Sequence, residues 1–111
     1  GYLEASGTSG VTLVTSVMGD KDVAGILEPL LPHAATVIAT RADTPRAMTS
    51  ATLASAVRTL AKAPLRVDEV PEAWSAVTRA LAIGGPVLLA GSIYLVGPLR
   101  GRLAAAGFEA A

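Results

Sequence analysis

The sequence is 111 residues long, which is the size of one domain or of part of one. Hydrophobic residues make up 51% of the chain and charged residues 16%, so we expect a buried core rather than a disordered chain. Nine basic residues balance nine acidic ones and cysteine is absent, which excludes a strongly basic nucleic-acid or membrane surface, a disulfide framework and a catalytic thiolate. The single histidine, His33, argues against a metal site built from histidines.

The first part of the chain predicts two strands with a short helix between them. Residues 1–10 contain three glycines and show no period, so we expect a loop or the remnant of a preceding helix. Residues 11–17 are rich in β-branched side chains and predict the first strand. Asp22 is a suitable N-cap for a helix that runs from residue 23 to about residue 31. Residues 36–40 are again β-branched and predict the second strand.

The middle of the chain predicts a helix, a short strand and a second helix. Thr49 or Ser50 would cap the first helix, which runs to about Lys62 with apolar residues at helical spacing. Residues 65–67 predict the third strand. The next helix would begin near Pro71, because proline suits the first helical position.

The last part of the chain predicts a fourth strand and a broken helix. Gly84-Gly85 would end the preceding helix, and residues 87–90 form an apolar strand. Residues 93–106 have a helical composition that Pro98 would interrupt. A helical pattern lies in every gap between the predicted strands. This alternation predicts an α/β fold with a mostly parallel sheet and helices on both of its faces.

Polar residues follow three of the four predicted strands, at the sheet edge where α/β proteins bind ligands. They are Asp20, Lys21 and Asp22 after the first strand, Arg41, Asp43 and Arg46 after the second, and Ser92 after the fourth. Each also has a plain structural explanation, as a solvated turn residue or a helix cap. Their position at one predicted edge is what favours a site for a small carboxylate or dianionic ligand.

The dipeptide Gly91-Ser92 joins the fourth strand to the following helix. Backbone N–H groups at such a junction can face an anion, but the same dipeptide is also common as a simple turn with an N-cap. No glycine-rich dinucleotide loop follows the first strand, and no P-loop occurs. Neither paired carboxylates nor a nucleophile with a base stands out, so the residues predict ligand binding rather than self-contained catalysis.

Three segments, in this order and spacing, resemble the carboxy-terminal domain of bacterial folylpolyglutamate synthase/dihydrofolate synthase, a family related to the Mur peptidoglycan ligases. They are residues 18–22, Thr40 with Pro45-Arg46-Ala47, and residues 90–97. The string Gly-Ser-Ile-Tyr-Leu-Val-Gly within the last segment is the most specific. The resemblance covers about residues 11–103 and implies a Rossmann-like domain over residues 11–111.

The resemblance implies that the full enzyme activates a folate or dihydropteroate carboxylate as an acyl phosphate, which the amine of L-glutamate attacks. This domain would close on a central ATPase domain and help to hold the glutamate. Lys21 would pair with a glutamate carboxylate, and Ser92 would donate a hydrogen bond to one. Arg46 matches the arginine that contacts the added amino acid in some Mur ligases. ATP and Mg²⁺ would bind mainly outside this chain, which would hold no cofactor, be inactive alone and be cytoplasmic.

One departure from the family pattern shapes further expectations. The motif Asp-Gly-Ala-His-Asn-Pro, which precedes the first strand in the family, does not occur, so we expect a domain truncated at its N-terminus. Loss of a central strand would leave a gap or an exposed sheet edge, through which the chain could associate with a second copy. The residues alone also leave open a receiver-like or regulatory α/β binding module, and an interaction domain without a ligand.

Overall fold

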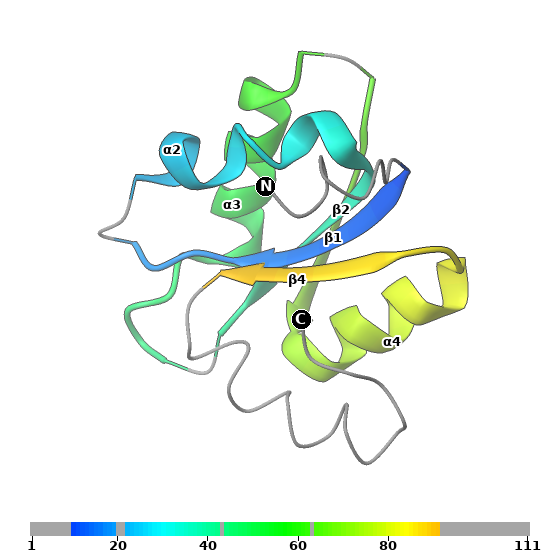
Figure 1. The fold of residues 1–111 in the computed structure, drawn as a ribbon. Helices are drawn as coiled ribbons and strands as arrows, with labels where there is room; N and C mark the ends of the chain where they lie inside the picture. Colours follow the sequence, from blue (N-terminus) through cyan, green and yellow to red (C-terminus); the bar gives the residue numbers. More distant parts are fainter. Residues whose placement is uncertain (1–9, 20–21, 43, 63, 92–111) are drawn as a thin grey trace.

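Four parallel strands form a single sheet in the order β3-β2-β1-β4 (Figure 1). The structure is a computed structural model that describes residues 10–19, 22–42, 44–62 and 64–91. The strands are β1 (Val11–Ser16), β2 (Ala34–Arg41), β3 (Arg66–Glu72) and β4 (Val87–Gly91). β1 pairs in parallel with β2 and β4, and β2 pairs in parallel with β3. The predicted parallel α/β fold is therefore confirmed.

Helices cover both faces of the sheet, as predicted. The helix α2 (Val23–Leu27), the 3-10 helix η1 (Leu31–His33) and the helix α3 (Ser50–Leu60) lie on one face, and α4 (Ala73–Ile83) lies on the other (Figure 1). A hydrophobic core lies on each face of the sheet, and successive residues of β1 point alternately into one core and the other. Leu13, for example, packs in the core on the α3 side. All six residues of β1 are buried, because neither of its faces meets solvent.

The helix α2 ends earlier than the sequence predicts. Its N-cap is Asp22 as expected, with the carboxylate accepting a hydrogen bond from the Gly25 backbone N–H at 3.2 Å. It ends at Leu27 rather than near residue 31, and a turn and η1 follow. Pro29 has no N–H for the next helical hydrogen bond and its ring would crowd the carbonyl four residues earlier, which explains the early end.

The predicted boundary between β3 and α4 was wrong. The strand continues past residues 65–67 to Glu72, and Ala73 is the first helical residue. The Glu72 carboxylate caps the helix by accepting hydrogen bonds from two backbone N–H groups of the first turn. Pro71 fits in β3 because this strand has a neighbour on one side only among the described strands and its register with β2 is irregular here. The Thr40 hydroxyl donates to the Pro71 carbonyl at 3.1 Å.

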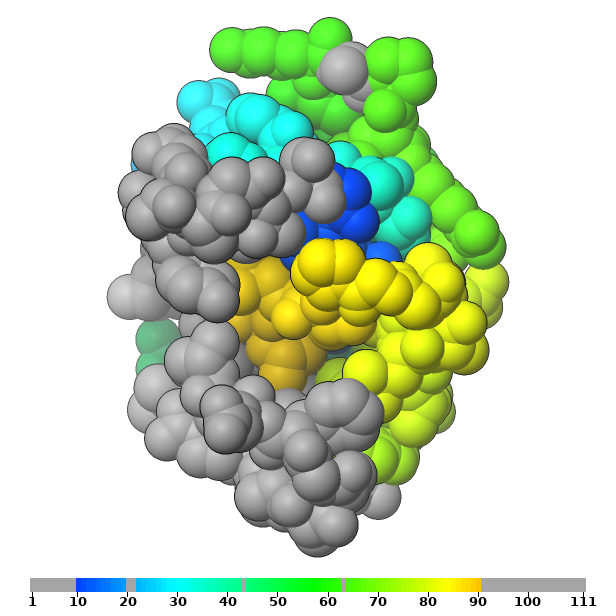
Figure 2. All heavy atoms as spheres, turned by 45° about the vertical axis from the view of Figure 1, so that its right-hand side comes forward, coloured from blue at the N-terminus to red at the C-terminus, as the bar shows by residue number. Residues whose placement is uncertain are grey.

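Gly84 and Gly85 end α4, as predicted. Both adopt positive φ angles, 85° and 78°, which L-residues with side chains rarely tolerate. The chain then enters β4, whose first four side chains are half-buried; Figure 2 shows this strand at the molecular surface beside α4. The helix predicted for residues 93–106 and the loop predicted for residues 1–10 lie outside the described residues, except for Gly10.

The four described strands form one continuous sheet without a gap. The gap expected from the loss of a central strand is therefore not found among them, and self-association through a sheet edge stays a prediction. None of the helices in the described part of the chain has the length and apolar character needed to cross a membrane.

Candidate functional site

The carboxyl ends of β1, β2 and β4 lie at one edge of the sheet. In the β1–β4 register, Ser16 is the partner of Gly91, so the last residues of these two strands are neighbours. The predicted ligand residues Lys21 and Ser92 follow these strand ends in the sequence but lie outside the described residues. The shared carboxylate site that the sequence predicts for these residues therefore stays a prediction, with neighbouring strand ends as its structural basis.

The loops that follow β1 and β2 are hydrogen-bonded to each other at this edge. Met18 and Ala47 form an antiparallel bridge. The Gly19 backbone N–H donates to the Arg46 carbonyl at 2.9 Å. The structure thus brings the third predicted residue, Arg46, against the segment that leads directly to Lys21.

Arg46 lies in a tight turn after β2. The Ala47 backbone N–H donates to the Thr44 carbonyl at 3.1 Å, which closes a β-turn with Pro45 and Arg46 at its centre. Proline is favoured at the first central position because its fixed φ angle suits this turn. The Arg46 side chain is exposed, so the turn presents a guanidinium at the carboxyl edge of the sheet.

Buried side chains and a buried hydrogen bond hold the two loops at this edge in place. The side chains of Met18, Ala42 and Ala47 are buried in the core on the α4 side of the sheet. The buried Ser16 hydroxyl accepts a hydrogen bond from the Ala42 backbone N–H at 2.9 Å. This bond joins the end of β1 to the residue that follows β2. The two loops that follow these strands therefore start from positions that are hydrogen-bonded to each other.

The sequence does not predict the structural role of two residues at this edge, Ser16 and Arg41. Ser16 resembles the other hydroxyl residues of its strand, and nothing in its neighbours predicts that it accepts a buried backbone bond. Arg41 was noticed as a charge after the second strand, but its contacts with the Arg46 turn depend on a chain reversal that local sequence does not specify. Pro45, which favours a turn, is the only local indication of this chain reversal.

The described part of this edge suits recognition of an anion. A guanidinium can form two parallel hydrogen bonds with one carboxylate. Within the described ranges, no group of three or more His, Cys, Asp or Glu side chains is placed to hold a metal ion. The chemistry that the exposed Arg46 guanidinium supports is therefore the binding of a carboxylate.

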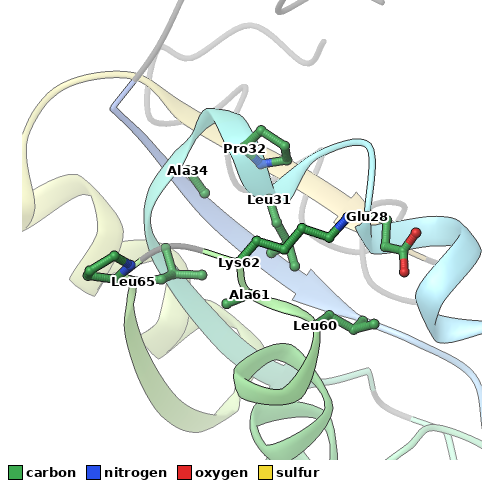
Figure 3. A pocket seen from close by; sticks show the side chains of 9 residues that line it. Glu28, Leu31, Pro32, Ala34, Leu60, Ala61, Lys62 and Leu65 are labelled. Carbon is green, nitrogen blue, oxygen red and sulfur yellow. The ribbon is translucent and has the colours of Figure 1, made fainter.

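A separate cavity of about 290 Å³ lies at the opposite edge of the sheet, near the start of β2 and the end of α3. Figure 3 shows the Lys62 side chain extended over this mostly apolar cavity. Its lining comprises Glu28, Leu31, Pro32, Ala34, Leu60, Ala61, Lys62, Pro64 and Leu65. Arg46, the one predicted ligand residue among the described residues, does not line it, so the candidate site rests on the strand ends and not on this cavity.

Comparison with known proteins agrees with the fold. Residues 3–93 match the sequence profile of the family described as Mur ligase, glutamate ligase domain. The chain is similar to Mycobacterium tuberculosis folylpolyglutamate synthase complexed with ADP and AMPPCP, at 29% identity and a TM-score of 0.76. The same synthase complexed with ADP gives 29% identity and a TM-score of 0.73.

Each of these similarities covers 83% of this chain and 23% of the synthase chain. The chain therefore spans about a quarter of the length of the solved structures that it matches. No curated protein sequence matches it.

Proposed function

Because the chain belongs to the Mur ligase, glutamate ligase domain family, we propose that it holds the incoming L-glutamate in an ATP-dependent ligase that acts on a folate or dihydropteroate. The similarity to folylpolyglutamate synthase supports a folate as the acceptor. The rest of such a ligase, including its ATPase domain, would lie outside this chain, which spans 23% of the synthase.

The observation that carries this proposal is the hydrogen bond between the Gly19 N–H and the Arg46 carbonyl. It joins two loops that carry two of the three predicted glutamate ligands, Lys21 and Arg46. The third, Ser92, directly follows Gly91, the β-sheet partner of Ser16. Glutamate has two carboxylates, and a site with two cations and a hydroxyl would match them.

The proposed role is to hold the nucleophile. In the ligase, the acceptor carboxylate is activated as an acyl phosphate, the glutamate amine attacks the acyl carbon, an amide bond forms and phosphate leaves. Residues of this chain would bind the carboxylates of glutamate, so that its amine stays unbound and reaches the acyl carbon in a defined orientation. The chain alone would therefore be inactive.

We propose that ATP and Mg²⁺ bind mainly outside this chain. When bound, they would activate the acceptor carboxylate. The location that we propose is the cytoplasm, where ATP is abundant.

The test is mutation of Lys21, Ser92 and Arg46, one at a time to alanine, in a full-length ligase that carries this domain. Each change should raise the KM for glutamate by roughly ten- to a hundred-fold, because a charge-assisted hydrogen bond is worth about 1.5–3 kcal/mol. The KM for ATP should stay unchanged. Arg58→Ala is a matched control, because it removes an exposed arginine of α3. An unchanged KM for glutamate in all three variants would refute the assignment.

A further inference from the structure

Arg41 is the last residue of β2, and its exposed guanidinium bridges two backbone carbonyls of the turn that follows. Its Nε donates to the Ala47 carbonyl at 3.3 Å, and its Nη2 donates to the Pro45 carbonyl at 3.4 Å. These two carbonyls belong to the residues on either side of Arg46. A planar guanidinium suits this task, because its donors are held at a fixed separation and can serve two acceptors together.

The backbone of Arg46 itself is also held at both ends. Its N–H donates to the Thr44 hydroxyl at 3.4 Å, and its carbonyl accepts from the Gly19 N–H at 2.9 Å. With the two bonds from Arg41, four hydrogen bonds therefore surround this one residue. Arg46 is exposed and lies in a turn, where a backbone without such contacts would sample several conformations.

We propose that Arg41 is a positioning residue, which fixes the Arg46 turn and thereby sets the affinity of the carboxyl edge for the amino-acid substrate. The proposal rests on the function proposed above and adds a residue to it. Holding the turn before the ligand arrives lowers the entropy lost on binding. Both bonds of Arg41 are long, and one is exposed while the other is only partly buried. Their loss should therefore change ligand affinity more than it changes the stability of the fold.

The test compares Arg41→Lys with Arg58→Lys in a full-length ligase that carries this domain. Lysine keeps the charge but cannot hold two carbonyls in a fixed geometry. Arg58 is the matched control, because its exposed guanidinium also donates to a backbone carbonyl, that of Val67, at 3.4 Å. Arg41→Lys should raise the KM for glutamate by roughly two- to tenfold, because it removes one or two long guanidinium–carbonyl hydrogen bonds that act on the substrate only through the turn. The kcat and the KM for ATP should stay unchanged, and Arg58→Lys should change none of these values.

A double-mutant cycle separates positioning from direct contact with the substrate. If Arg41 acts through Arg46, then Arg41→Lys should have no further effect on the KM for glutamate when Arg46→Ala is already present. Additive effects of the two changes would overturn the positioning role, and so would an unchanged KM in Arg41→Lys alone. An unchanged KM in Arg46→Ala would instead remove Arg46 from the proposed function, and Arg41 with it. Thermal unfolding of Arg41→Lys and Arg58→Lys should give similar midpoints, and a much lower midpoint for Arg41→Lys would assign it to the fold instead.

Discussion

Thr15 and Ser16 are adjacent buried hydroxyl residues of β1 with opposite hydrogen-bond status. The Ser16 hydroxyl accepts the Ala42 N–H, whereas the Thr15 hydroxyl has no hydrogen-bond partner among the described residues. Both side chains have no exposed surface. Removal of the Ser16 hydroxyl should therefore lower the stability of the fold, because a buried N–H loses its acceptor. Removal of the Thr15 hydroxyl should raise it, because a buried polar group without a partner is lost.

We expect Ser16→Ala to lower the free energy of unfolding by about 1–3 kcal/mol, because it leaves the buried Ala42 N–H without an acceptor. Thr15→Val keeps the shape of the side chain and removes an unsatisfied hydroxyl, so it should raise that free energy by about 1 kcal/mol. Chemical denaturation of both variants measures the difference. Shifts of the same sign would show that the hydrogen bonding at this end of β1 is different from that described here.

At the scale of the elements, the sequence predicts a helix or strand boundary correctly where nearby residues determine it, as at a helix cap. Asp22 caps α2 as predicted, and α3 is capped by Thr49, one of the two residues that the sequence offers for this role. The prediction failed at β3, because its charged residues and Pro71 are typical of a loop or a helix start. A strand that has a neighbour on one side only, as β3 has among the described strands, tolerates them, since charges and proline there also oppose the addition of a further strand. Only the position of β3 at the edge of the described sheet, a non-local property, explains the longer strand.

The helix cap that the sequence did not predict gives a direct test of this boundary. Glu72→Ala removes the acceptor of the Trp74 and Ser75 backbone N–H groups, which lie 2.6 Å and 3.1 Å from its carboxylate oxygens. It should lower the free energy of unfolding by about 1 kcal/mol. Glu69→Ala, an exposed residue of the same strand, should have little effect in the same urea titration. Equal losses in both variants would place the start of α4 elsewhere.

At the scale of the whole molecule, the sequence predicted the alternation of strands and helices but not the strand order. A strand–helix–strand unit has the same local sequence pattern whether its second strand lies on one side of β1 or on the other. Only the long-range pairing of the strands therefore decides their order. The same holds for the site. The residues after each strand could be named, but the pairing of Ser16 with Gly91 and the bridge between Met18 and Ala47 depend on the folded sheet. The position of Arg46 in a turn could be predicted from Pro45. The hydrogen bonds that Arg41 makes to this turn could not be predicted from the sequence.

The sheet separates the candidate site, at the carboxyl ends of the strands with Arg46, from the apolar cavity at the opposite ends of the strands. The most direct test of the account is an NMR titration of the ¹⁵N-labelled chain with millimolar glutamate. The amide signals of Gly19, Arg46 and Gly91 should shift, while those of Ala61 and Leu65 beside the cavity should not. Shifts centred on the cavity residues, or none at the carboxyl edge at saturating glutamate, would contradict the claim that this edge holds the amino acid.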